Sequence, residues 1–108
     1  MHIEDQTVGD AAVVRLDGSL DTTTASDALA HFEALVADGQ SLIVADFSSV
    51  EFVSSAGLRV LLATAKNIGS SGSLRLFGLN PSVREVFEVS GFSTILAIFD
   101  DEAAALAG

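Results

Sequence analysis

Hydrophobic and polar residues are arranged in short segments that predict strands and helices in turn. Residues 3–8 and 11–17 flank the pair Gly9-Asp10, a two-residue turn suited to positive φ, and together they predict a β-hairpin. The alternation breaks within residues 12–16, which indicates a strand covered on much of both faces. The chain is therefore expected to open with an antiparallel pair of strands.

Apolar residues at spacings of three and four then predict two amphipathic helices. The first follows the polar turn 18–24, with Asp21 or one of the threonines as its N-cap and Gly39 as its left-handed end. The second runs from about residue 55 to residue 68. The two apolar stripes contain Ala25, Ala28, Leu29, Phe32, Leu35 and Val36 in the first helix, and Leu58, Leu61, Leu62, Ala65 and Ile68 in the second.

Two further helices are predicted in the last third of the chain. One begins with Asn80 as N-cap and Pro81 at the first helical position, where its missing N–H costs nothing, and Gly91 stops it. The other is Ala-rich and follows the acidic residues 100–102, whose negative charge suits the start of a helix.

The remaining apolar segments predict strands. Residues 41–47 are nearly all apolar, as in a central strand buried on both faces, and residues 73–77 and 94–99 predict two more strands. Residues 48–53 are expected to form a loop. The order β-β-α-β-α-β-α-β-α favours a single α/β domain over residues 1–108: a mixed sheet opened by a hairpin, with about four helices packed on it.

Composition narrows the classes of partner. The 108 residues are 49% hydrophobic, so a disordered chain is excluded, and no apolar run is long enough to cross a bilayer. Because 15 acidic residues against 5 basic ones give a formal net charge of −10, nucleic acids and anionic membranes are disfavoured. The N-terminus lacks the basic flank and apolar stretch of a signal peptide, so we expect a cytoplasmic protein that binds another protein or a small ligand.

Enzyme signatures are missing from the sequence. There is no cysteine, and the only histidines are His2 at the N-terminus and His31 beside the first apolar stripe, where a structural role is expected. The pair Asp100-Asp101 is interpreted as a solvated helix start, and the glycine-serine segment 69–72 as a turn. We therefore expect no catalytic residue, no metal site and no cofactor.

A pair of serines stands where the second helix begins. The first N–H groups of a helix lack intrahelical partners and the helix dipole is positive there, so a phosphate on Ser55 would be tolerated. Small Ala56 and Gly57 would leave this serine uncrowded. Serines at helix starts are usually caps, however, and Ser54 is expected to be one; local physics alone does not select Ser55.

Three segments in register resemble the STAS family, specifically the bacterial anti-sigma-factor antagonists. The segment 18–21 is similar to the family's Gly-x-Leu-Asp turn, and the segment 46–58 to its central signature, a strand ending in Asp followed by Asp/Ser-Ser-x-Gly-Leu. The segment 79–92 resembles the part before the last strand. Where the family often has Asp before the acceptor serine, this chain has Ser54, which leaves open whether Ser54 is modified as well.

The resemblance implies a partner switch without enzymatic activity of its own. An unmodified antagonist of this type binds an anti-sigma factor, often an ATP-dependent serine kinase, and is released when that kinase phosphorylates the serine that corresponds to Ser55. A PP2C-type phosphatase would reverse the modification, and ATP and metal would belong to these partners. The residues expected to flank the contact surface are Asp21, Thr22, Asp46, Ser54, Ala56, Gly57, Leu58 and Arg59.

Two other interpretations remain open at this stage. The sequence does not exclude a STAS subunit of a lipid- or ion-transport complex that docks without phosphorylation and has the same fold, although the serine at the acceptor position favours the switch. A small enzyme that uses clustered carboxylates as acid and base is the other alternative, although no spacing in the sequence supports it.

Overall fold

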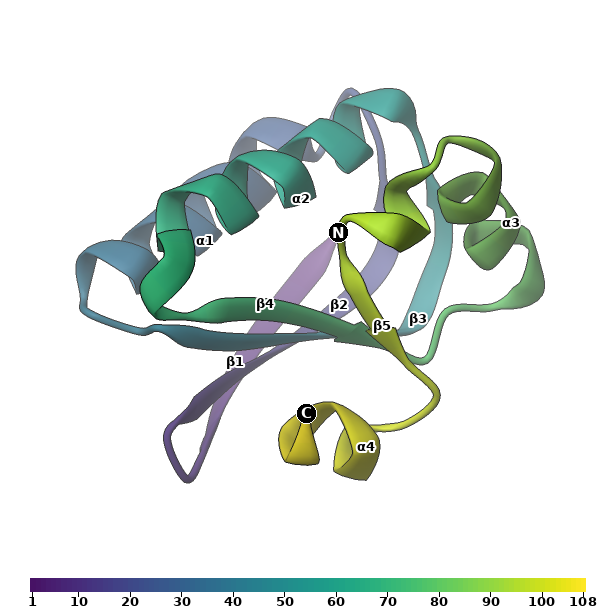
Figure 1. The fold of residues 1–108 in the computed structure, drawn as a ribbon. Helices are drawn as coiled ribbons and strands as arrows, with labels where there is room; N and C mark the ends of the chain where they lie inside the picture. Colours follow the sequence, from purple (N-terminus) through teal and green to yellow (C-terminus); the bar gives the residue numbers. More distant parts are fainter.

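Five strands form one mixed sheet in the computed structural model, which describes residues 1–108 (Figure 1). Their spatial order is β1-β2-β3-β4-β5, with β1 and β2 antiparallel and every later neighbour parallel. The strands are β1 (His2–Val8), β2 (Ala11–Leu20), β3 (Leu42–Val53), β4 (Ser73–Phe77) and β5 (Ala97–Phe99). The predicted fold class, a mixed sheet opened by a hairpin, is confirmed.

Helices cover both faces of this sheet. Figure 1 shows α1, α2 and α3 on one face and α4 alone on the other. The helices are α1 (Ala25–Ala37), α2 (Ser55–Ile68), α3 (Pro81–Val89) and α4 (Glu102–Ala107), with short 3-10 turns at Gly69–Ser71 and Phe92–Thr94. None of the four helices is long and apolar enough to traverse a lipid bilayer.

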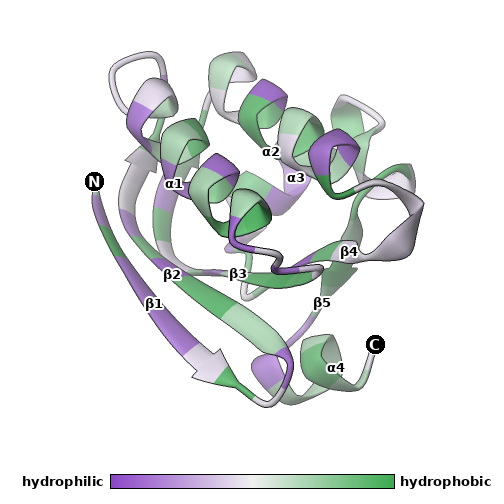
Figure 2. Cartoon of the chain, turned by 90° about the vertical axis from the view of Figure 1, so that its left-hand side faces the viewer, coloured by the Kyte–Doolittle hydropathy of each residue, from purple (hydrophilic) through white to green (hydrophobic).

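The sheet separates two apolar cores, because successive side chains of a strand point to opposite faces (Figure 2). The larger core packs β2 and β3 against α1, α2 and α3, and includes an edge-to-face pair of Phe47 and Phe87 with ring centroids 6.2 Å apart. The smaller core packs Val13, Val44 and Phe77 against Ala105 of α4. The double coverage predicted for residues 12–16 follows from this arrangement.

Most helix ends agree with the sequence patterns. Asn80 accepts a hydrogen bond from the Val83 N–H at 2.8 Å and Pro81 is the first helical residue of α3. Gly39 has φ 92°, as required for the left-handed residue that ends α1. The short final helix begins after the side chain of Asp101, which accepts the Ala104 N–H at 2.8 Å.

The prediction of a loop at residues 48–53 was wrong, and so was that of a turn at residues 18–20. Both segments continue the parallel pairing of β2 with β3, up to the pair Leu20 and Val53. The pairing slips twice, and each time β3 contributes one more residue than β2. These bulges interrupt the period-two alternation of β3, so its buried residues Val50 and Val53 are three positions apart. That spacing does not match the alternation expected of a strand, and the sequence pattern therefore did not predict one here.

The last strand is shorter than predicted. Residues 94–96 were expected to belong to it, but the N–H groups of Thr94, Ile95 and Leu96 donate to Gly91 and Phe92 carbonyls in a tight turn. Only Ala97–Phe99 pair with β4.

Candidate partner-binding and modification site

The adjacent ends of β2 and β3 fix the position of the α2 start. Leu20 and Val53 are paired, and the Ser54 N–H donates to the Leu20 carbonyl at 2.9 Å. Asp21 follows Leu20 directly, and Ser55 follows Ser54. We call Asp21, Thr22 and residues 54–59 the α2-start site.

The two serines of this site have different roles. Ser54 has extended backbone with φ −89° and ψ 175°, and its Oγ accepts the Gly57 N–H at 3.3 Å, so the predicted N-cap is confirmed. Ser55 is the first residue of α2 and is exposed. Its hydroxyl makes no hydrogen bond within the chain, so it is free to react or to contact a partner.

Gly57 has a packing role that the sequence analysis missed. A Cβ atom at this position would lie 2.6 Å from the Leu20 carbonyl oxygen and 2.8 Å from the Leu20 Cγ. The glycine therefore lets α2 approach the end of β2 closely. The signal that could have indicated this is a glycine inside an otherwise regular helical pattern.

Asp21 is held in a ring of hydrogen bonds. Its Oδ1 accepts from the Thr23 hydroxyl at 2.7 Å, the Thr23 N–H at 2.9 Å and the Thr24 N–H at 3.3 Å. The hydroxyl and backbone donors of Thr23, followed by those of Thr24, lower the pKa of Asp21 below 3.8. The side chain of Thr24, the residue before α1, makes no capping bond, so Asp21 is the residue whose side chain organises this loop. Because its pKa is lowered, Asp21 is ionised at neutral pH.

The remaining residues of the site differ in accessibility. Thr22 and Arg59 are exposed and Ala56 is half-buried, whereas Gly57 and Leu58 are buried, Leu58 with 6% exposure. Leu58 packs in the larger core, so it supports the site from below and its side chain is covered by the fold. Arg59 makes no ion pair within the chain, and it lies one turn after Ser55 on the same face of α2.

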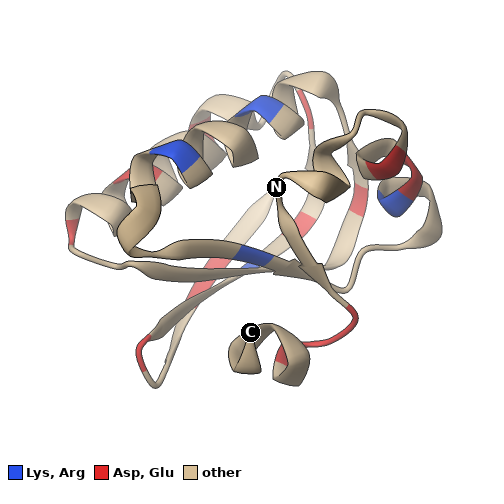
Figure 3. Cartoon of the chain, in the orientation of Figure 1, with Lys and Arg blue, Asp and Glu red and all other residues tan.

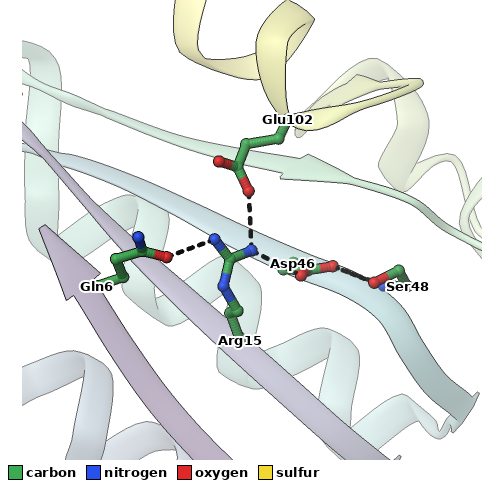
Figure 4. Close-up of polar contacts among 5 residues, drawn as sticks. All are labelled: Gln6, Arg15, Asp46, Ser48 and Glu102. Atoms are coloured by element: carbon green, nitrogen blue, oxygen red, sulfur yellow. Dashed lines mark hydrogen bonds and ion pairs between the residues drawn. The ribbon is translucent and has the colours of Figure 1, made fainter. Parts of the chain in front are cut away.

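Asp46 does not belong to this site, contrary to the prediction. It points to the α4 face of the sheet, where its Oδ2 accepts from Arg15 Nη1 at 2.9 Å and its Oδ1 from the Ser48 hydroxyl at 2.6 Å (Figure 4). Because β3 continues to Val53, Asp46 lies in mid-strand rather than at its end. Asp46 was expected to flank the contact surface around Ser55, and the structure places it on the α4 face of the sheet instead.

The same arginine ties the C-terminal helix to the sheet. Arg15 Nη1 also donates to Glu102 at 2.8 Å, and Nη2 donates to Gln6 at 2.6 Å. Hydrogen bonds to Glu102 and to Asp46 raise the pKa of Arg15. Sequence analysis missed this network, although opposite charges within two buried strands were a signal for it.

The histidines form contacts within the fold. The ring of His31 is half-buried and its Nε2 lies 2.6 Å from Asp5, joining α1 to β1, and that of His2 lies 2.8 Å from Glu4. The 108 residues contain no cluster of three or more His, Cys, Asp or Glu side chains that could hold a metal ion.

Comparison with known proteins identifies the family to which this fold belongs. The STAS domain model matches residues 2–105, and the chain belongs to this family. It is 40% identical over 93 residues to BtrV of Bordetella bronchiseptica, described as a candidate anti-sigma factor antagonist, which covers 85% of this chain and 80% of BtrV. It is 31% identical over 97 residues to RsfB of Mycobacterium tuberculosis, an anti-sigma-F factor antagonist, which covers 90% of this chain and 80% of RsfB.

Solved structures show the same architecture. An anti-sigma factor antagonist from Mycobacterium paratuberculosis superposes with a TM-score of 0.92 at 26% identity, covering 98% of this chain and 91% of that one. The unphosphorylated form of SpoIIAA, also an anti-sigma factor antagonist, has a TM-score of 0.75 at 20% identity over 98% of this chain and 94% of its own. The predicted resemblance to STAS proteins of the antagonist type is confirmed.

Proposed function

We propose that this chain is an anti-sigma factor antagonist whose docking is controlled by phosphorylation of Ser55. The observation that supports the proposal is that the two serines have different roles in the structure. Ser54 caps α2, whereas the Ser55 hydroxyl is exposed and free at the first helical position. Relatives named as anti-sigma factor antagonists support the class of partner.

The unmodified site suits close packing by another protein. The neutral Ser55 hydroxyl lies among small or polar neighbours, with Thr22 and Arg59 exposed beside it. An anti-sigma factor with serine-kinase activity would bind this surface and place its γ-phosphate donor at Ser55. ATP and its metal ion would belong to that partner.

Phosphorylation would break the complex through charge and desolvation. A phosphoserine carries about −1.5 to −2 charges at pH 7, which a surface packed against a neutral hydroxyl would have to desolvate. Asp21 beside it adds like charge. A loss of about 3 kcal/mol, equal to more than a hundredfold in affinity, is a reasonable scale. A PP2C-type phosphatase would then restore the binding form.

The experiment combines phosphorylation mapping with binding. The chain is incubated with ATP and candidate kinase anti-sigma factors, and mass spectrometry locates the phosphate. Ser55→Ala is expected to bind and not be released by ATP, Ser55→Asp is expected to bind poorly, and Ser54→Ala serves as the control that is still modified. Undiminished binding of Ser55→Asp would refute the proposal. If the chain binds only a subunit of a transport complex and Ser55 stays unmodified, the transport alternative is supported.

A further inference from the structure

An exposed apolar groove lies between the end of β3 and α3, next to the α2-start site. Phe52 of β3 is 52% exposed and Val89 of α3 is 82% exposed, and apolar side chains exposed near one another mark candidate interaction sites. Two shallow hollows, one between Phe52 and Val86 and one beside Val89, are adjacent and share Ser82 and Val86 in their linings. We call this surface, formed by Glu51, Phe52, Ser82, Glu85, Val86 and Val89, the β3–α3 groove.

The walls of the groove are fixed in place by the fold. Strand β4 pairs only with residues 42–46 of β3, so the second half of β3 has α3 beside it in place of a strand. The Asn80 side chain donates to the Val50 carbonyl at 3.0 Å, and Phe87 packs edge-on against Phe47. The groove is therefore preformed, and a partner need not order it on binding.

The rim of the groove is acidic. Glu51 and Glu85 line it, and Glu88 precedes Val89. The one cation of α3, Arg84, is placed 3.5 Å from Asp100. Figure 3 shows acidic positions on both α3 and β3. A second copy of the chain, with its formal net charge of −10, would bring like charges together here, whereas a cationic segment would be attracted.

Position relates the groove to the proposed function. Phe52 lies three residues before Ser55, at the same end of β3. We propose, resting on the function proposed above, that the β3–α3 groove binds a cationic amphipathic segment of the same anti-sigma partner. Apolar side chains of that segment cover Phe52 and Val86, and its Lys or Arg residues face Glu51 and Glu85. The groove thereby contributes to the affinity for the partner, and this contribution does not depend directly on whether Ser55 is phosphorylated.

The test uses the purified anti-sigma factor that phosphorylates Ser55, with affinity measured by calorimetry. Phe52→Ala is expected to weaken binding about tenfold or more, as for a central aromatic anchor. Its matched control is Ile95→Ala, because Ile95 is a 60% exposed apolar residue outside the groove. The double variant Glu51→Lys/Glu85→Lys is expected to weaken binding and to flatten its dependence on salt. The charge control is Glu33→Lys/Asp38→Lys, because Glu33 of α1 and Asp38 just after it are both exposed and lie outside the groove.

The outcomes separate this inference from the proposed function. Groove variants that bind like the wild type, while Ser55→Asp still fails to bind, overturn the groove alone. Binding by Ser55→Asp as tight as that of the wild type overturns the proposed function. If sedimentation shows that the chain dimerises and that Phe52→Ala abolishes the dimer, a second copy of the chain occupies the groove. That result also overturns the inference. Unfolding midpoints show whether each variant is folded. If Phe52→Ala does not fold, the Glu51→Lys/Glu85→Lys variant and its charge control provide the test.

Discussion

Replacing Gly57 by alanine tests the geometry on which the α2-start site depends. The added methyl group would overlap the Leu20 carbonyl oxygen at 2.6 Å and the Leu20 Cγ at 2.8 Å. The carbonyl cannot move aside freely, because it accepts the Ser54 N–H at 2.9 Å. The start of α2 must therefore shift away from β2.

Two opposing terms set the size of the effect. Overpacking typically costs about 1–3 kcal/mol, and weakening the Ser54–Leu20 hydrogen bond adds about 1 kcal/mol. Alanine is better than glycine within a helix by about 1 kcal/mol. Since the steric terms exceed the helix-propensity term, we expect a net destabilisation of about 1–3 kcal/mol.

Urea unfolding followed by circular dichroism measures this change. Asn67→Ala is the matched control, because Asn67 is exposed in the same helix and its replacement is expected to leave stability unchanged or slightly raised. A Gly57→Ala variant as stable as the wild type, or more stable, would show that α2 begins farther from Leu20. The kinase reaction at Ser55 provides a second readout, since a displaced helix start is expected to slow it.

Three further predictions concern individual side chains. Ser54→Ala is expected to lose about 0.5–1 kcal/mol of stability through its cap, and Ser55→Ala less than about 0.5 kcal/mol, by the same urea assay. The lowered pKa of Asp21 stabilises its ionised form, so this contribution is present above the ordinary aspartate pKa of 3.8 and is lost as the pH falls through the lowered pKa. Asp21→Asn should therefore be less stable than the wild type at pH 7 and match it in strong acid. Arg15→Met is expected to cost about 1–3 kcal/mol because it leaves the Asp46 carboxylate, whose side chain is 12% exposed, without its cation; replacing Asp46 as well should recover part of the loss.

The sequence predicts those parts of the fold that depend on local chemistry. Helix starts at Asn80 and Ser54 and the left-handed end at Gly39 are each decided by a side chain and its own backbone neighbours. The order of strands and helices follows from hydrophobic periodicity in the same way. The choice of Ser55 over Ser54 comes from the family resemblance, because local chemistry alone does not select it.

The remaining features depend on residues far apart in the chain. The bulges of β3 depend on its pairing with β2, and the close contact at Gly57 depends on the position of Leu20. The exposure of Phe52 likewise reflects the end of β4, which leaves half of β3 without a strand on that side. The pattern within β3 does not contain this information, and the glycine in α2 indicates a close approach without identifying Leu20 as the neighbour.

The location of Asp46 changes how release must work. With Asp46 paired to Arg15 on the far face, Asp21 is the one carboxylate within the α2-start site, and the exposed cation Arg59 lies on the same face as Ser55. With one carboxylate and one cation among its residues, the site is not a concentrated acidic patch before modification. The cost of docking the phosphorylated form must then come mainly from desolvating the phosphate itself. We therefore expect Asp21→Asn to leave most of the hundredfold loss on phosphorylation in place, measured as the ratio of affinities for the two forms. If the affinities of the unmodified and phosphorylated forms of this variant are nearly equal, release is caused by repulsion from Asp21 instead.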